Sequence, residues 1–307
     1  MADGENKGQR LLGIFDRLSR GETISKEALA REYGVTEKSI QRDIDDIRSY
    51  LSGAAGGPAD ISYNRQEKGY RLVEEESGRL TRKEILAMAK ILLESRAFAK
   101  EELHTILDKL IDACPQSGRQ VVEDLVRNEA FCYVPPRHGR KLLDALWDIS
   151  LFIKKKEIIR LHYRRQDGAE RQHTLKPVAL LFSEFYFYLV AYKDEETSFP
   201  TVFRVDRIET MEKTGDHFQV PYRDRFKDGE FRKRVQFMYP GVLRRVTFTY
   251  SGPSVEAVLD RLPTARILSR KDGIYILNAE AYGKGLDMWL GSQGKWVKVL
   301  QSEEITS

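Results

Sequence analysis

Cysteine is nearly absent from this sequence, which has two, Cys114 and Cys132, among 307 residues. The two lie 18 positions apart, and neither a CxxC pair nor a cluster of histidines accompanies them. A disulfide framework needs several cysteines, and a structural zinc site needs four closely spaced ligands. The sequence therefore predicts neither, and we expect a protein of the reducing cytoplasm that holds no metal and no cofactor.

Long apolar runs are also lacking. The most apolar stretch, residues 178–192, is interrupted by Ser183 and Glu184, whereas a membrane-spanning helix needs about 20 mostly apolar residues. The first seven residues carry two acidic side chains and none of the apolar core of a signal peptide. These absences predict a protein that does not enter a membrane.

A strong excess of one charge is missing too. The chain has 51 Lys and Arg against 47 Asp and Glu, a net charge of +4, which argues against a polycationic protein. The charge is unevenly distributed, because residues 1–76 hold 12 basic and 15 acidic side chains, whereas residues 137–250 hold 23 and 16. We therefore expect the later segment to bind an anion.

Three helical patterns fill the first part of the chain. Ser25 is a typical N-cap, Gly34 suits the left-handed residue of a tight turn, and Thr36 is placed to cap the helix that follows. Three helices with a glycine turn before the third form a helix-turn-helix, whose third helix enters the DNA major groove. The expected helices are residues 9–20, 25–33 and 37–51.

Two short strand-like runs, residues 61–64 and 70–73, predict a β-hairpin wing after the third helix. On that helix, Gln41 has the chemistry to bond adenine and Arg42 to bond guanine or phosphate, while basic wing residues contact phosphates. The candidate DNA-contacting residues are Thr36, Lys38, Ser39, Gln41, Arg42, Arg65, Lys68 and Arg71.

The alternative for this segment is a protein-interaction module, since its net charge is negative. Residues 29–47 together with Gly69-Tyr70-Arg71-Leu72 resemble the winged helix-turn-helix of DeoR-type bacterial regulators. The resemblance implies DNA binding. Acidic residues on the third helix, among them Asp43 and Asp45, imply modest non-specific affinity, so we expect a dimer that reads two half-sites.

Residues 79–112 hold two helical patterns and residues 120–128 a third. Thr81 and Glu84 have the spacing of a capping box at the start of the first, and Cys114-Pro115 ends the second, before residue 120. Most of their apolar residues have the spacing of ordinary packing. The alternative is that these helices form a dimer interface and transmit a conformational signal.

From residue 158 the pattern changes from helical to alternating, and Gln166-Asp167-Gly168 is a typical hairpin turn. A helix over residues 138–156 precedes this change. Closely spaced antiparallel strands of this kind favour a small barrel. The expected strands are residues 158–164, 172–177, 185–192 and 201–208.

Several strand motifs in this region resemble successive strands of a WYL domain. In the triplet that names the family, Phe187-Tyr188-Leu189, phenylalanine stands where tryptophan is usual. The resemblance implies an Sm-like or SH3-like β-barrel that senses nucleotides or nucleic acid. The motifs are Tyr163-Arg164, Leu175-Lys176-Pro177, residues 187–192 and residues 203–208.

An anionic ligand such as an oligonucleotide needs guanidinium groups for its phosphates and aromatic faces for its bases. Arg204 and Arg207 lie three apart, so on a strand they point to opposite faces, and we favour Arg204 with Asp206 beside it. The alternative roles are core packing for the tyrosines and surface exposure for the arginines and histidines. The candidate ligand-binding residues are Tyr163, Arg164, His173, Tyr188, Arg204 and Arg207.

The last 64 residues follow a β-α-β-β-α-β pattern, which predicts a ferredoxin-like α/β unit. Trp289-Leu290-Gly291 and residues 297–300 resemble the extension that commonly follows a WYL domain. The resemblance implies dimer contact and partial enclosure of the ligand face.

The predicted fold is α+β and multidomain. The combined resemblance implies a bacterial transcription regulator, in our interpretation a repressor in phage-defence or stress control. It would bind double-stranded operator DNA as a homodimer and sense a nucleotide or a single-stranded nucleic acid. The predicted divisions are a winged helix-turn-helix at 1–76, a helical linker or dimerisation region at 77–136, a WYL ligand-sensing domain at 137–243 and an extension at 244–307.

The alternative function is a nucleic-acid-processing enzyme or an accessory nucleic-acid-binding protein. Gly291 and Gly294 are separated by two residues where a phosphate-binding loop needs four, and Trp296 stands where that loop has the hydroxyl that binds magnesium. No catalytic serine, metalloprotease or paired-carboxylate motif is present. We therefore expect a protein that is not an enzyme.

Overall fold

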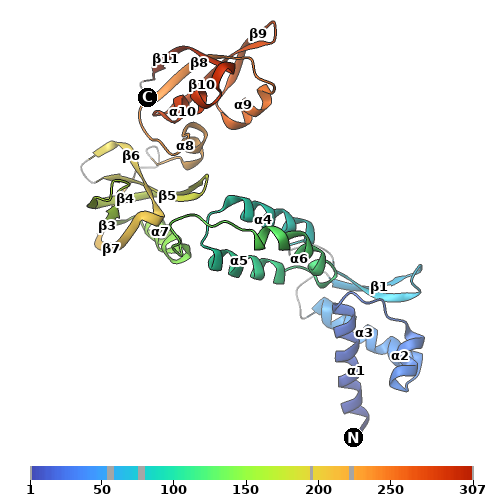
Figure 1. Cartoon of the computed structure of the whole chain (residues 1–307). Helices are drawn as coiled ribbons and strands as arrows, with labels where there is room; N and C mark the ends of the chain where they lie inside the picture. Colours follow the sequence, from blue (N-terminus) through green and yellow to red (C-terminus); the bar gives the residue numbers. More distant parts are fainter. Residues whose placement is uncertain (1, 54–58, 75–79, 194–195, 221–224, 306–307) are drawn as a thin grey trace. The chain divides into compact units, whose positions relative to one another are not determined.

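Figure 1 shows the computed structural model of the chain. The described residues separate into two compact units, one comprising Met1–Arg96 and Lys100–Pro135 and the other Ala97–Ala99 and Pro136–Ser307. The predicted boundary between residues 76 and 77 lies outside the described residues. Those not described are residues 1, 54–58, 75–79, 194–195, 221–224 and 306–307.

The first unit begins with the three helices and the hairpin that the sequence predicts. Ser25 accepts a hydrogen bond from the N–H of Ala28 at 3.4 Å, and Gly34 closes the second helix with a φ of 64°. The elements are α1 (Ala2–Ser19), α2 (Lys26–Tyr33), α3 (Glu37–Gly53), β1 (Ala59–Asn64) and β2 (Gly69–Glu74). Their shared core includes Ile14, Leu18, Leu29, Ile40, Ile44 and Ile61, which are almost completely buried.

Three further helices pack together in the same unit, α4 (Arg82–Ser95), α5 (Lys100–Asp112) and α6 (Gln116–Phe131). The predicted capping box is present, because Thr81 accepts from the N–H of Glu84 at 3.2 Å and the Glu84 carboxylate accepts from the N–H of Thr81 at 2.8 Å. These bonds satisfy two donors that a helix start leaves unpaired. Cys114 is buried and Cys132 is exposed.

The second unit contains a five-stranded antiparallel sheet in the order β6-β5-β4-β3-β7. It is an open sheet and not the predicted barrel, because its edge strands β6 and β7 do not pair with each other anywhere in the described chain. The chain leaves β6 through the 3-10 helix Val205–Arg207 and enters β7, which pairs with β3 instead. The strands are β3 (Glu157–Arg164), β4 (Glu170–Ser183), β5 (Tyr186–Lys193), β6 (Glu196–Arg204) and β7 (Ile208–His217).

One face of this sheet packs on α7 (Leu143–Lys155), as Figure 1 shows. Phe187, which stands where the WYL triplet usually has tryptophan, packs its ring 5.1 Å from that of Phe182 and 5.5 Å from that of Phe98, both centroid to centroid. Phenylalanine therefore still fills an aromatic core position. The buried residues of this core include Ile149, Phe152, Ile159, Leu161, Leu175, Leu189 and Phe203.

A short helix that the sequence analysis missed, α8 (Asp228–Arg234), packs on the other face of the sheet. Phe231 and Val235 lie in a cluster with Leu181 and Val190 of the sheet, and the Phe231 ring stacks on Tyr282 at 5.4 Å. Only seven residues long and mostly charged, α8 has too few apolar positions for a periodicity to stand out. The position of α8 is set instead by the packing of Phe231 and Val235 on strands that are distant in the sequence.

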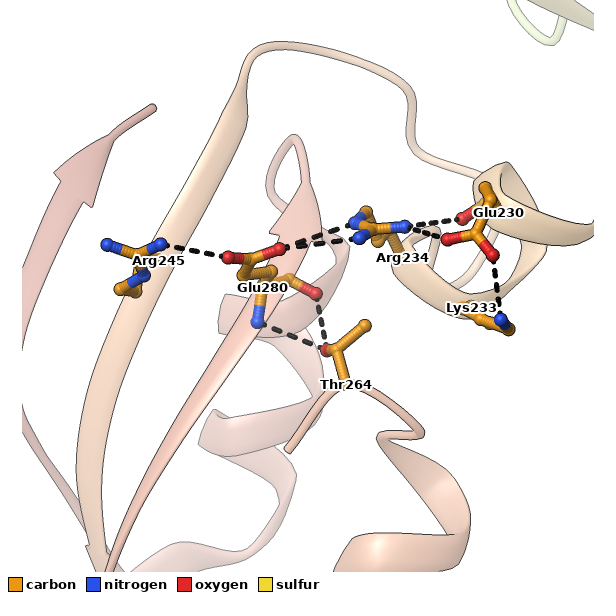
Figure 2. Close-up of polar contacts among 6 residues, drawn as sticks. All are labelled: Glu230, Lys233, Arg234, Arg245, Thr264 and Glu280. Carbon is orange, nitrogen blue, oxygen red and sulfur yellow. Dashed lines mark hydrogen bonds and ion pairs between the residues drawn. The ribbon is translucent and has the colours of Figure 1, made fainter. Parts of the chain in front are cut away.

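Polar contacts also hold α8 to the C-terminal sheet (Figure 2). The Glu280 carboxylate accepts from Arg245 at 3.0 Å and from Arg234 at 3.5 Å, and Arg234 also donates to Glu230 at 2.6 Å. Hydrogen bonds from Lys233 and then Arg234 lower the pKa of Glu230 to about 2. Pairs that remain partly open to solvent, as these do, contribute little free energy of unfolding individually. The chain of contacts therefore orients α8 more than it stabilises it.

The C-terminal segment has the predicted β-α-β-β-α-β order, and its sheet has the strand order β11-β8-β10-β9. Gly285 lies so close to the segment after α8 that a Cβ atom there would be 1.9 Å from the carbonyl oxygen of Gln236. The elements are β8 (Leu243–Tyr250), α9 (Val255–Arg261), β9 (Arg266–Lys271), β10 (Ile274–Tyr282), α10 (Gly285–Ser292), the 3-10 helix Gly294–Trp296 and β11 (Val297–Glu304).

Among the residues that the structure describes, none of the helices combines the length and the apolar character that crossing a membrane requires.

Candidate nucleic-acid interface and anion-binding cluster

The N-terminal end of α3 presents polar and basic side chains to solvent. Thr36 accepts from the N–H of Ser39 at 3.2 Å and so caps the helix as the sequence predicts. Lys38 and Arg42 are exposed, and neither side chain makes a hydrogen bond or an ion pair with another described residue. Two cations are thus available for phosphates or base edges at the end of α3 that a helix-turn-helix inserts into the groove.

Gln41 is placed differently from Arg42. Its Oε1 accepts from the Lys26 ammonium at 3.0 Å and from the Tyr70 hydroxyl at 2.9 Å, while its Nε2 donates to Asp45 at 3.2 Å. These bonds join α2, α3 and β2 around one amide. Because the amide oxygen already has two donors, Gln41 is better suited to hold the hairpin against α3 than to bond a base.

The hairpin is tied to the helices by its backbone as well. Tyr70 and Ile24 exchange two backbone hydrogen bonds, at 2.7 and 2.9 Å, which fix the start of β2 to the loop before α2. In the hairpin turn, Arg65 and Lys68 are exposed, whereas Arg71 on β2 is half-buried. The structure therefore places two of the three predicted wing cations in solvent.

A buried ion pair joins α1 to α3. The Arg10 guanidinium donates to both carboxylate oxygens of Asp43, at 2.6 and 3.3 Å, and the two side chains are 9% and 1% exposed. Asp43 was counted among the acids of the third helix that imply modest non-specific DNA affinity, and its burial in this pair corrects that expectation. A buried carboxylate with a cation beside it does not weaken DNA affinity as an exposed one does.

In the second unit, Arg204 lies at the centre of a polar and aromatic cluster. Its Nε and Nη2 donate to the two carboxylate oxygens of Asp206, at 3.0 and 2.8 Å, and its guanidinium carbon lies 3.3 Å from the ring centroid of Tyr186. Tyr188 is the cross-strand partner of Arg204. We call Arg204, Asp206, Tyr186 and Tyr188 the Arg204 cluster. It combines a cation with aromatic faces, as binding of an aromatic anion requires.

The side-chain charges of this cluster are well defined. Burial by itself would lower the pKa of Arg204, but its hydrogen bond to Asp206 and the nearby negative charge raise it. The net effect is a raised pKa, so the guanidinium stays cationic. Burial raises the pKa of Tyr188, so its phenol keeps its proton. Asp206 is only 7% exposed. The anion-binding capacity of Arg204 is thus partly used by an internal carboxylate.

The strand geometry on which we separated Arg204 from Arg207 does not hold. Strand β6 ends at Arg204, and Val205–Arg207 form a 3-10 helix, so the alternation of a strand does not apply to Arg207. Arg207 is half-buried. The adjacency of Arg204 and Asp206 is present, although a turn and not a strand produces it.

Tyr163 and Arg164 are not members of the Arg204 cluster, although Tyr163 is hydrogen-bonded to it. Tyr163 contacts it only through its hydroxyl, which accepts from the backbone N–H of Arg204 at 3.3 Å. Arg164 is exposed and paired with Glu170 and Glu209, both at 3.4 Å. These residues line a separate cavity of about 310 Å³.

His173 packs its ring 5.4 Å from that of Phe203. Burial, and then the positive charges of Lys193 and Arg171, lower its pKa, so its imidazole is neutral near pH 7. A neutral imidazole has no net charge with which to attract a phosphate. The geometry therefore places His173 among the packed residues of the sheet.

Tyr186 and Arg140 were missed by the sequence analysis. Tyr186 lies two residues before Tyr188 on β5, and this alternation was the signal that would have placed both rings on one face. Arg140 donates to the backbone oxygen of Asp206 at 3.2 Å from a segment 66 residues away, and no local pattern predicts that contact. Across the described parts of the chain, no group of His, Cys, Asp or Glu side chains is arranged to hold a metal ion.

Comparison with known proteins identifies one segment. Residues 144–213 match the family model of the WYL domain, which confirms the WYL prediction for this part of the chain. It covers the five-stranded sheet from β3 into β7 and includes the Arg204 cluster. A comparison with curated proteins gave no match.

Two solved structures are similar to the chain at low identity. One, "Proteasome accessory factor B/C (PafBC) of Arthrobacter aurescens", is 18% identical, with 97% of this chain and 44% of that chain covered and a TM-score of 0.30. The other, "Crystal structure of a CRISPR Cas-related protein", is 15% identical, with 64% and 56% covered and a TM-score of 0.37. The chain spans about half the length of both, and TM-scores this low do not establish a shared fold.

Proposed function

We propose that this protein is a ligand-responsive, sequence-specific DNA-binding regulator. The observation that carries the proposal is the N-terminal end of α3, where Lys38 and Arg42 are exposed and joined to no other described side chain by a hydrogen bond or an ion pair. Tyr70 and Gln41 hold the β1–β2 hairpin against the same helix. A helix end with exposed cations and a hairpin fixed beside it suits the major groove and the flanking phosphates.

The domain divisions at 1–76, 77–136, 137–243 and 244–307 belong to this proposal, as does a homodimer. One winged helix contacts too few base pairs for tight specific binding, so two copies on two half-sites supply the affinity. Exposed apolar residues on the helices of the first unit, Ile91, Val121 and Leu125, support a role for these helices in pairing.

The second part of the proposal concerns the signal. The Arg204 cluster offers a cation, a stacked ring and a half-buried phenol on one sheet face, which suits a nucleotide or a single-stranded nucleic acid. Such a ligand regulates only if it binds one conformation of the dimer more tightly than another. Following the resemblance, we propose a repressor in phage-defence or stress control.

The test begins with selection of operator sequences from random duplexes by the full chain. Arg42→Gln should lower the affinity for the selected duplex about tenfold or more, since a bidentate base contact contributes about 1–3 kcal/mol. Arg127→Gln, an equal change of charge at an exposed site on α6, should leave affinity unchanged. Failure to enrich any sequence, or equal affinities of the two variants, would contradict the DNA-binding proposal.

A further inference from the structure

A second cavity in the second unit lies between the turn joining β4 to β5, α8 with the segment after it, and α9. Its volume is about 350 Å³, which is large enough for a small organic molecule. Its lining includes two cations, one acid and one buried amide. The polar and aromatic lining residues are Phe182, Ser183, Glu184, Arg232, Gln236, Phe237 and Arg261.

Arg261 of α9 has an unused donor beside this cavity. Its Nη2 donates to Glu184 at 3.0 Å, and its guanidinium carbon lies 5.1 Å from the ring centroid of Phe237. Its Nε is buried and has no hydrogen-bond partner among the described residues. A buried N–H without an acceptor is unfavourable, and a rotation of the Arg261 side chain toward the cavity would let a ligand oxygen satisfy it.

The other polar groups favour an anionic ligand. Arg232 of α8 donates to the backbone oxygen of Phe182, which holds its guanidinium at the cavity wall. Gln236 is 6% exposed and makes one long hydrogen bond, 3.5 Å from its Nε2 to the backbone oxygen of Arg261. Two guanidinium groups face a single carboxylate, that of Glu184, so the charged lining is positive by one unit.

The rest of the wall is apolar and its backbone is strained. Leu181, Val235 and Met238 are buried and line the cavity together with Phe237. Glu184, Phe237 and Met238 have φ angles of 57°, 50° and 53°, in the left-handed region that large side chains rarely occupy. Strained residues of this kind cluster at ligand-binding sites.

We propose that this cavity binds a small molecule that carries a phosphate or carboxylate group on an apolar body. The oxyanion accepts from the Nε of Arg261 and pairs with Arg232, while the apolar body packs on Phe237 and Met238. The site is distinct from the Arg204 cluster, because both of its cations lie outside residues 144–213 and none of the four cluster residues lines it. It does not rest on the proposed DNA binding.

Calorimetric titration of the full chain with phenyl phosphate, phenylacetate and neutral 2-phenylethanol tests the proposal. We expect one of the two acids to bind saturably and the alcohol not to bind. Arg261→Lys keeps the positive charge but lacks the Nε–H, and should weaken binding of the acid about 10- to 100-fold, the effect of losing a charge-assisted hydrogen bond. Arg266→Lys, on the exposed strand β9, is the matched control and should bind as the unmodified chain does.

A second variant, Ser183→Trp, fills the cavity without a change of charge and should also abolish binding, with circular dichroism confirming that each variant folds. The acid that binds identifies the ligand as a phosphate ester or a carboxylate. The proposal is wrong if neither acid binds up to about 10 mM, if the alcohol binds equally well, or if Arg261→Lys has no effect. Loss of binding in Arg204→Lys but not in Arg261→Lys would place the acid in the Arg204 cluster and also overturn it.

Discussion

Arg204 and Asp206 form a two-point ion pair within the WYL segment, with Nε and Nη2 of the guanidinium 3.0 and 2.8 Å from the two carboxylate oxygens. A phosphate that binds Arg204 must share the guanidinium with this carboxylate or replace it. Asp206 therefore competes with any external anion for the Arg204 guanidinium.

Replacing Asp206 should raise the affinity for a ligand, whereas replacing Arg204 should lower it. Asp206→Asn removes the competing charge, so we expect a short single-stranded oligonucleotide to bind several-fold more tightly. Arg204→Ala should weaken the same binding about 10- to 100-fold. Fluorescence anisotropy measures both, with Arg160→Ala on the exposed side of β3 as the control. Unchanged affinity in both variants would remove the cluster from the ligand site.

Gln41 is expected to position the hairpin, because Lys26 and Tyr70 both donate to its amide oxygen. Gln41→Ala should lower operator affinity about tenfold, since loss of an interaction network of this kind changes binding by about 1–2 kcal/mol. Tyr70→Phe removes only the hydroxyl and should have a smaller effect in the same direction. If Gln41→Ala changes the preferred base pair while Tyr70→Phe binds normally, Gln41 reads a base directly.

The buried pair of Arg10 and Asp43 should be sensitive to loss of one partner. Asp43→Asn removes the buried negative charge that accepts from the Arg10 guanidinium, whose side chain is 9% exposed, and we expect the free energy of unfolding to fall by about 3–5 kcal/mol. The double variant Arg10→Met with Asp43→Leu should recover most of this loss. Urea denaturation measures all three proteins, and a loss below about 1 kcal/mol in Asp43→Asn would show that the pair is not desolvated.

Two glycines offer a matched test of how the segment after α8 is anchored. Gly285→Ala places a methyl group against the carbonyl oxygen of Gln236, and we expect a loss of about 1–3 kcal/mol in stability. Gly229→Ala meets no atom within 4 Å and should change stability by less than about 1 kcal/mol. Thermal denaturation of both variants measures the difference. Equal melting temperatures would contradict the close approach of Gly285 to the carbonyl oxygen of Gln236.

His173 should contribute to the pH dependence of stability. Burial and nearby positive charges lower its pKa in the folded chain, so in mildly acidic solution the unfolded chain binds the additional proton. This contribution is absent well above about pH 6.5 and destabilises the fold as pH falls below that value. His173→Gln should therefore lose less stability than the unmodified chain between about pH 7.5 and about pH 5, measured by denaturant unfolding. An equal loss of stability in the variant and in the unmodified chain would contradict a lowered pKa of His173.

Local features of this protein could be predicted from the sequence. The cap at Ser25, the turn at Gly34, the capping box of Thr81 and Glu84 and the hairpin turn at Gly168 each depend on residues a few positions apart. The β-α-β-β-α-β order follows from longer patterns of the same kind, whereas the WYL segment was identified by the resemblance of its strand motifs to a known family. Interactions between near neighbours in the chain determine these features, so the sequence by itself was sufficient.

The tertiary structure decided which polar groups remain available. Arg10 and Asp43 are 33 residues apart, Gln41 and Tyr70 are 29 apart, and Glu184 and Arg261 are 77 apart. Whether a side chain is buried, paired or free depends on such distant partners, which no local pattern specifies. The same reason explains why α8, the open sheet and the cavity beside Arg261 became visible only in the folded chain.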